Sequence, residues 1–182
     1  MVKTVVKKYQ VYDYNDLKNN DELFDKCYEN WLSNPDNING WSDENIESFK
    51  TFAEQLNMKI DYSLSNAEYP DRSCYIKLDN TNYYYIAPND RVKHISEYIK
   101  DYKGNGYYIC DNLKTYTDKL INQWNKDYSI NDFSKDIENK MFDLWFEDNQ
   151  DYFSKENFLQ LVECNEYEFY ECGDKVFLEG EE

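Results

Sequence analysis

The chain has 182 residues, of which 41% are hydrophobic and 18% aromatic, and it carries a formal net charge of −17. Its 19 tyrosines exclude a disordered acidic tail, because such segments are poor in aromatic residues. The negative field repels nucleic acid and anionic membranes and attracts basic partners, and no stretch approaches the roughly 18 apolar residues that a membrane span needs.

The first third of the chain predicts a strand followed by two helices. Lys3–Tyr14 is rich in β-branched and aromatic residues, which is typical of a strand. Asp21–Leu32 predicts a helix, and the Pro, Gly and Asn content of Ser33–Gly40 predicts a loop after it. Ser42 can cap the next helix, in which apolar residues recur at helical spacing as far as Leu56.

The middle of the chain predicts three short strands, at Met58–Leu64, Arg72–Leu78 and Asn82–Ala87. The segment DNTN, Asp79–Asn82, is typical of a hairpin turn. We therefore expect the second and third of these strands to pair with each other.

The second half predicts mainly helices. Asp90 can cap a helix that ends at Lys103–Gly106 (KGNG), where glycine and asparagine tolerate a left-handed backbone. Further elements are expected in this order: helices at Asp111–Trp124, Asn131–Asn149 and Ser154–Glu163, then two short strands around a turn within Cys164–Glu182.

Strands thus cluster in the middle and at the two ends, with helices between them. This order favours an α+β fold in which small antiparallel sheets pack with several helices and an acidic hairpin closes the chain. The length suggests a single domain, 1–182. The alternative is a subdivision near 103–110 into an N-terminal αβ part and a C-terminal helical part with the hairpin.

The cysteine pattern indicates a reducing compartment. The five cysteines are widely spaced and form no CxxC motif, so we expect reduced thiols in a cytoplasmic protein. A disulfide between Cys164 and Cys172 across the final hairpin is the alternative. The N-terminal lysines are not followed by the continuous apolar segment of a signal peptide.

The sequence offers little for catalysis or for metal binding. His94 is the one histidine, and it lies at the margin of the apolar side of its expected helix. Zinc would need paired Cys and His ligands, no phosphate-binding glycine loop occurs, and Glu147–Glu156 lacks the central glycine of a calcium loop. We therefore expect no catalytic residue, no metal and no cofactor, and a protein-binding module rather than an enzyme.

The negative charge is concentrated toward the C-terminus. From Asn131 onward, 16 acidic residues stand against four lysines, a net charge of −12. At about 100° per residue, four carboxylates of the expected helix fall within about 60° of arc: Asp132, Asp136, Asp143 and Glu147. In the final hairpin, Glu166 and Glu168 alternate with Tyr167 and Phe169, so they are expected on the opposite side of the strand.

Two interpretations of these charges remain open. A run of charges is often an ordinary solvated surface. Carboxylates two apart on a strand are roughly 7 Å apart, which is of the order of the charge repeat along a nucleic acid backbone, so the same groups can mimic phosphates. The local excess favours the second interpretation, because self-repulsion makes such a surface costly to fold. The expected partner-binding residues are then Asp132, Asp136, Asp143, Glu147, Glu166 and Glu168.

Two segments carry a resemblance to known proteins. KYQVYDYNDL near the N-terminus, followed by a helix containing Asn30-Trp31, and SKENFLQLVECNEYEFYECGDKVF near the C-terminus resemble small acidic proteins of phages and mobile elements of Firmicutes. The matching positions at the end include Asn165, Tyr167, Phe169 and Gly173, whereas Cys172 stands where an acid is more usual. As a whole, the chain resembles type II-A anti-CRISPR proteins, which inhibit Cas9.

This resemblance implies binding to Cas9, with its guide RNA, and competition with DNA for a basic channel. It implies neither direct nucleic-acid binding nor catalytic residues. An antitoxin that neutralises a basic toxin or nuclease of a mobile element is the alternative, since some of the similar proteins carry an antitoxin-like label. An enzyme without a recognisable motif is a third.

Overall fold

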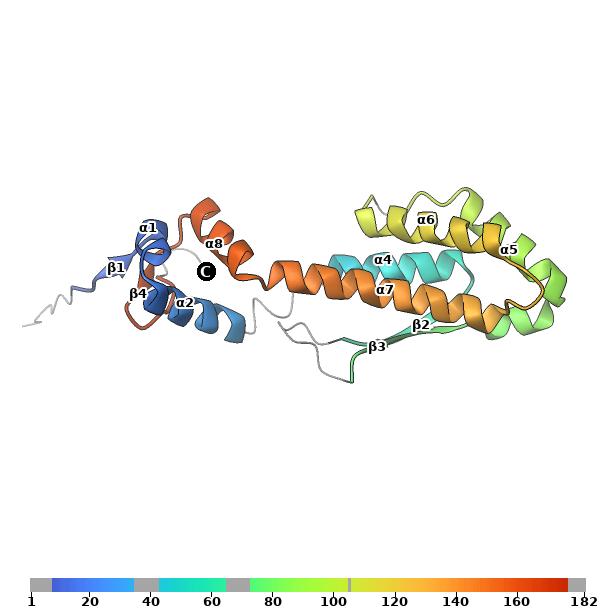
Figure 1. The fold of residues 1–182 in the computed structure, drawn as a ribbon, viewed down its shortest axis with the longest axis horizontal. Helices are drawn as coiled ribbons and strands as arrows, with labels where there is room; N and C mark the ends of the chain where they lie inside the picture. The colour runs from blue at the N-terminus through green and yellow to red at the C-terminus, as the bar shows by residue number, and fades with distance from the viewer. Residues whose placement is uncertain (1–7, 35–42, 65–72, 105, 177–182) are drawn as a thin grey trace, which may run out of the picture. The chain divides into compact units, whose positions relative to one another are not determined.

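The computed structural model describes residues 8–34, 43–64, 73–104 and 106–176 (Figure 1). The start of the strand expected at Lys3, most of the Ser33–Gly40 loop, the Ser42 cap and the last residues of the hairpin lie outside these ranges. The described chain contains seven α-helices and two antiparallel sheets of two strands each, so the expected α+β class is confirmed.

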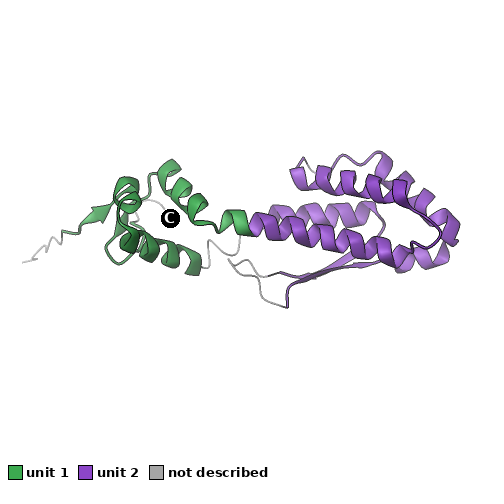
Figure 2. Ribbon diagram, viewed as in Figure 1, with its two compact units in different colours: residues 1–39, 150–182 green, residues 40–149 purple. Residues whose placement is uncertain are grey.

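The chain divides into two compact units (Figure 2). Unit 1 comprises residues 1–39 and 150–182, and unit 2 comprises residues 40–149. The subdivision that the sequence suggested near 103–110 is not where the units meet, because the helices before and after it, α5 (Pro88–Lys100) and α6 (Tyr108–Gln123), pack against each other inside unit 2.

Unit 1 contains the first and last elements of the chain. These are β1 (Val11–Tyr12), α1 (Tyr14–Lys18), α2 (Asp21–Ser33), α8 (Lys155–Cys164) and β4 (Phe169–Tyr170). β1 pairs antiparallel with β4, and Phe169 forms a further bridge with Lys175 after the turn. The helices expected over Asp21–Leu32 and after Ser154 are confirmed, and the Ser154 side chain accepts a hydrogen bond from Asn157 N.

The expected strand Lys3–Tyr14 is wrong at its C-terminal end, because the chain becomes helical at Tyr14. The Asp13 carboxylate accepts hydrogen bonds from Asn15 N at 2.8 Å and Asp16 N at 3.1 Å, and Asp16 accepts one from Asp13 N at 3.1 Å. This reciprocal capping starts α1 where continued strand pairing was expected.

The core of unit 1 is largely aromatic. Trp31 lies 5.6 Å from Phe153 and 5.3 Å from Phe158, measured between ring centroids. The Tyr28 hydroxyl donates a 2.5 Å hydrogen bond to Phe153 O, so this buried tyrosine has its polar end satisfied. The packing joins α2 to the segment that leads into α8.

Unit 2 contains the remaining elements. They are α4 (Asp43–Gln55), β2 (Lys59–Ser63), β3 (Tyr75–Asp79), the 3₁₀ helix η1 (Thr81–Tyr85), α5 (Pro88–Lys100), α6 (Tyr108–Gln123) and α7 (Ile130–Tyr152), whose last residues belong to unit 1. The expected helices are confirmed, with α6 starting before Asp111 and α7 continuing beyond Asn149. α5 starts at Pro88 rather than behind an Asp90 cap, since proline suits the first helical position.

The expected pairing of the middle strands is wrong. β2 pairs with β3, from Lys59 opposite Asp79 to Ser63 opposite Tyr75, and the expected third strand is η1. The Asp79 carboxylate accepts a 3.0 Å hydrogen bond from Thr81 N, which turns the chain out of the strand direction. Tyr83 is then fully buried, and a single buried position in this segment suits one helical turn better than an alternating strand.

One side of α7 completes the core of unit 2. Figure 1 shows α4 and α6 alongside α7, and buried side chains of all three helices belong to one apolar cluster with residues of β3, η1 and α5. The buried residues of α7 include Phe133, Ile137, Met141, Leu144 and Trp145. Their spacing of three or four residues leaves the opposite side of the helix for solvent.

We predict that Ile137→Ala lowers the free energy of unfolding by about 2–5 kcal/mol, because the side chain is completely buried and its loss leaves a cavity. Asn139→Ala, at an exposed position of the same helix, is the control and should stay within about 0.5 kcal/mol of wild type. Urea unfolding followed by circular dichroism measures both. Equal stabilities of the two variants would contradict the assignment of this side of α7 to the core.

Candidate acidic binding surface

The four acids expected on one side of a helix lie on α7, away from its buried side. Asp132, Asp143 and Glu147 are exposed, and Asp136 is half-buried. We call these four residues the acidic ridge. Within the described residues, two carboxylates of the ridge accept hydrogen bonds that hold the local fold and the other two accept none.

Asp132 caps the start of α7. Its carboxylate accepts hydrogen bonds from Ser129 N at 2.8 Å and from Ser129 Oγ at 2.6 Å, and Asp132 N donates to Ser129 Oγ at 3.2 Å. The hydrogen bonds from the Ser129 side chain and backbone lower the pKa of the Asp132 carboxyl, so it stays ionised at neutral pH.

Asp136 is held by Tyr128. The Tyr128 hydroxyl donates a 2.5 Å hydrogen bond to Asp136 Oδ2, and the Tyr128 ring packs edge-on against Trp124. Asp132 and Asp136, together with Asn125, Asp127 and Tyr128, line a hollow of about 390 Å³. An acidic hollow with an aromatic wall has the chemistry to accept a lysine or arginine side chain.

Asp143 and Glu147 are the uncommitted part of the ridge. Neither carboxylate accepts a hydrogen bond or forms an ion pair within the part of the chain that the structure describes. Burial raises the pKa of Tyr116 on α6, and the charges of Asp136 and Asp143 raise it further. The ridge therefore continues along α7 next to the Tyr116 hydroxyl.

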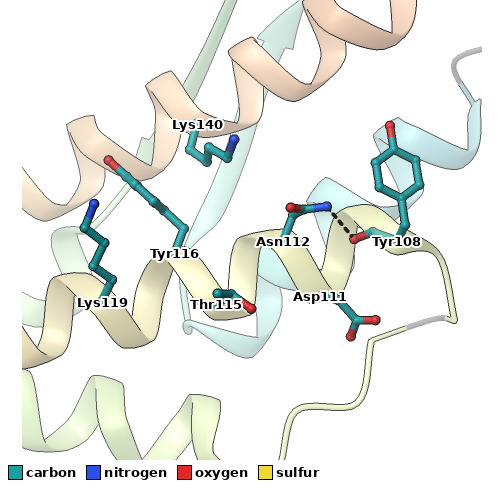
Figure 3. A pocket seen from close by; sticks show the side chains of 7 residues that line it. All are labelled: Tyr108, Asp111, Asn112, Thr115, Tyr116, Lys119 and Lys140. Carbon is teal, nitrogen blue, oxygen red and sulfur yellow. Dashed lines mark hydrogen bonds between the residues drawn. The ribbon is translucent and has the colours of Figure 1, made fainter.

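Positive side chains flank the ridge. A groove of about 420 Å³ between α6 and α7 is lined by Tyr108, Asp111, Asn112, Thr115, Tyr116, Lys119 and Lys140 (Figure 3). Lys140 extends from α7 and Lys119 from α6, and the Lys119 amine lies on the side of the groove where the Tyr116 hydroxyl lies (Figure 3).

Asp148 has a structural role that the sequence did not indicate. Its carboxylate accepts a hydrogen bond from Asn45 Nδ2 at 2.9 Å and another from the Tyr108 hydroxyl. Asn45 and Tyr108 lie in the first turns of α4 and α6, where a negative charge is favourable. Asp148 therefore joins three helices, although it directly follows the exposed Glu147.

The two hairpin acids lie in unit 1. Glu166 and Glu168 are exposed, whereas Tyr167 is half-buried and Phe169 is buried. The strand expected to carry this alternation begins only at Phe169, and Glu166, with a φ of +53°, lies in the turn after α8. Together with Asp13 and Glu163, the two glutamates contribute to the lining of a hollow of about 320 Å³. The six expected contact residues are thus divided, four in unit 2 and two in unit 1.

The hairpin turn is fixed by Gly173. Its φ of +91° favours glycine, and a Cβ at this position would lie 2.9 Å from Lys26 O on α2. Asn30 Nδ2 also donates to Cys172 O at 3.3 Å and to Asp174 Oδ1 at 3.0 Å. The turn is therefore docked on α2, which positions the glutamates that precede it.

The residues considered for chemistry are dispersed. Among the described residues, no three His, Cys, Asp or Glu side chains are grouped as a metal site would require. His94 is half-buried beside Tyr98. All five cysteines are free, so the alternative disulfide between Cys164 and Cys172 is not formed. Cys27 and Cys110 are buried, Cys74 is half-buried, and Cys164 and Cys172 are exposed. Burial raises the pKa of Cys27 to about 11.

Comparison of the chain with known protein families, curated proteins and solved structures finds no match. Within the described ranges, no helix has the length and apolar character needed to cross a bilayer.

We predict that the free energy of unfolding falls as the pH rises above about 10. Burial raises the pKa of Tyr128, Tyr108 and Tyr102, and hydrogen bonds to Asp136, Asp148 and Cys110 add to the shift. Because the folded state holds these protons more tightly, their contribution is complete below the unfolded pKa of about 10 and is lost toward the higher folded pKa.

Tyrosinate absorbance and circular dichroism, followed together during an alkaline titration, test this prediction. Tyr128, Tyr108 and Tyr102 should ionise at higher pH than the other tyrosines, together with loss of the fold, and Tyr128→Phe should reduce the dependence on pH. Ionisation of all tyrosines near pH 10 with an intact fold would refute the expectation.

We also predict that Asp148→Ala lowers the free energy of unfolding by about 2 kcal/mol, because it leaves the buried Asn45 amide without its acceptor. Glu147→Ala, one residue earlier and exposed, should change it by less than about 0.5 kcal/mol. Chemical denaturation of the two variants gives the comparison. A larger loss for Glu147→Ala would mean that the roles of the two acids are reversed.

Proposed function

We propose that this chain is a protein-binding inhibitor of the type II-A anti-CRISPR class, of phage or mobile-element origin. It binds guide-loaded Cas9 in the cytoplasm of the bacterial host cell and blocks target DNA binding and cleavage. It acts by occupancy and not as an enzyme, and it needs no cofactor. The observation that carries the proposal is the acidic ridge of α7, with Asp143 and Glu147 exposed and uncommitted.

The geometry of the ridge supports competition with nucleic acid. The four carboxylates extend from residue 132 to residue 147, which is about 22 Å along a helix axis. A helix holds them at fixed positions, so little conformational entropy is lost when a basic groove closes on them. The basic channel that holds the heteroduplex in Cas9 is the kind of surface that such a row of charges fits.

The cap and tyrosine contacts of the ridge determine how it should be tested. Replacing Asp132 removes the acceptor of the α7 cap, and replacing Asp136 removes the acceptor of the Tyr128 hydroxyl. A variant that neutralises all four acids therefore loses stability together with charge. Asp143 and Glu147 can be changed without removing a hydrogen bond within the described residues. Variants at these two positions therefore test binding to the partner without also destabilising the fold.

We predict that the double variant Asp143→Asn/Glu147→Gln inhibits guide-loaded Cas9 at least about 30-fold less well, with an unchanged unfolding midpoint. Truncating one partner of a desolvated charge pair costs about 2–5 kcal/mol, and 1.4 kcal/mol corresponds to a factor of ten. A DNA-cleavage assay over a series of inhibitor concentrations measures the effect. The affinity of wild type should fall as the salt concentration rises.

The matched control is Glu54→Gln/Asp101→Asn, which removes two exposed charges from α4 and from the end of α5. It should inhibit like wild type. The hairpin variant Glu166→Gln/Glu168→Gln should also lose inhibition, by a smaller factor. If the α7 double variant inhibits as well as the control, the ridge is a solvated surface and does not contact Cas9.

The function itself is tested by pull-down with guide-loaded Cas9 followed by the cleavage assay. Inhibition should be stoichiometric. Two outcomes would overturn inhibition by occupancy. One is that a single inhibitor molecule disables many Cas9 molecules, and the other is that the inhibitor itself cuts the guide or target strand. Capture of a basic toxin in place of Cas9 would favour the antitoxin alternative.

A further inference from the structure

Two neighbouring tyrosines of η1 are presented to solvent. Tyr85 is 94% exposed and Tyr84 is 56% exposed, whereas Tyr83 between β3 and these two is fully buried. Exposed aromatic rings leave a large apolar area in water and are enriched at the centres of protein interfaces. The notable feature here is how firmly the short segment that carries them is fixed.

η1 is anchored to the loop that follows α4. The buried Tyr83 hydroxyl donates a 2.7 Å hydrogen bond to Leu56 O, and Asn82 Nδ2 donates to Asn57 O at 3.0 Å. At the C-terminal end, Arg91 Nε donates to Ile86 O at 3.1 Å. These contacts hold the backbone on both sides of Tyr84 and Tyr85, so the two rings project from a rigid base.

A second set of contacts fixes η1 to the start of α7. The Asn80 amide, which is buried, donates to Ser134 Oγ at 2.8 Å and to Asn131 Oδ1 at 3.0 Å. The Tyr84 hydroxyl also approaches Asn131 Oδ1 at 3.5 Å. These contacts place η1 against the first turn of α7, in unit 2.

Charges of both signs lie at the ends of η1, Asp79 at its start and Arg91 at its end, so the net charge of the whole chain decides the kind of partner. Hydrogen bonds from the Thr81 and Ser129 backbones and side chains lower the pKa values of Asp79 and Asp132, so both carboxylates are ionised at neutral pH. With a net charge of −17, a second copy of the chain, a nucleic acid or an anionic membrane would be repelled. A basic protein surface is attracted, and arginine side chains stack on tyrosine rings and pair with carboxylates.

We propose that Tyr84 and Tyr85 are an aromatic anchor of the contact surface and bind arginine side chains of a basic protein groove. The identity of the partner as guide-loaded Cas9 rests on the proposed function. The aromatic anchor and the acidic ridge both belong to unit 2. The ridge supplies attraction at long range, and the fixed rings supply short-range contact with little entropic cost.

The test is the dissociation constant of the complex with guide-loaded Cas9 for Tyr85→Ala and for Tyr84→Ala/Tyr85→Ala. Loss of an interface anchor should weaken binding about 30-fold, mainly through faster dissociation. Urea unfolding of Tyr85→Ala should match wild type, because the side chain is almost fully exposed. Tyr85→Phe should retain most of the affinity, since it keeps the ring.

The control is Tyr9→Ala, which removes an exposed tyrosine of unit 1 and should leave the affinity unchanged. If wild type binds Cas9 and Tyr85→Ala binds equally well, the anchor is overturned while the proposed function stands. If Tyr85→Phe binds as weakly as Tyr85→Ala, the proposal that arginine stacks on the Tyr85 ring is overturned.

If wild type does not bind Cas9, the proposed function fails, and the anchor is decided by a simpler probe. Wild type and Tyr85→Ala are titrated with an arginine homopolymer peptide and a lysine peptide of equal length. A preference for arginine that is lost in Tyr85→Ala supports the anchor, because the net charge of the protein is unchanged. No difference between the two proteins overturns it.

Discussion

The buried side of α7 is the constraint on which the arrangement of unit 2 depends. Phe133, Ile137, Met141 and Trp145 must be covered, and the residues that cover them come from α4, α5, α6 and the sheet. Once this side faces inward, helical geometry directs Asp143 and Glu147 to solvent. The acidic ridge is therefore a direct consequence of core packing.

A chain this negative must also limit its self-repulsion. Six ion pairs lie within the described residues, and nearly all of their side chains are exposed, so they contribute little. Hydrogen bonds from tyrosine hydroxyls and at helix caps stabilise the carboxylates more than these ion pairs do. Asp136 accepts a hydrogen bond from Tyr128, Asp148 accepts one from Tyr108, and Asp132 accepts one from Ser129. A neutral donor stabilises a carboxylate without cancelling its charge, so the surface keeps its negative field.

The sequence predicted those elements whose signal is local and repeated. α7 and α4 have long apolar periodicities, and both were expected within a few residues of their observed bounds. The prediction of a hairpin turn at Asp79–Asn82 was wrong. Asn80 donates hydrogen bonds to Asn131 and Ser134, which lie 51 and 54 positions later in the chain, and no local sequence pattern reveals such contacts. The short α1 was missed although Asp13 and Asp16 have the spacing of a capping box.

The sequence predicted which side of the helix carries the candidate site. It did not predict what each acidic residue on that side does. Helical spacing placed the four ridge acids on one side, but the commitment of Asp136 depends on Tyr128 beyond the helix start. The importance of Asp148 depends on partners 103 and 40 residues away. Tyr84 and Tyr85 were expected in a strand, where one of them would be turned inward, and 3₁₀ geometry leaves both outside.

We propose that the exposed acids of α7 contact Cas9. Carboxyl footprinting by mass spectrometry, with and without guide-loaded Cas9, tests it most directly because it reads each carboxylate in the wild-type protein. The account predicts that labelling of Asp143 and Glu147 falls in the complex, while labelling of Glu54 and Asp101 is unchanged. Unchanged labelling of Asp143 and Glu147 in a formed complex would contradict it.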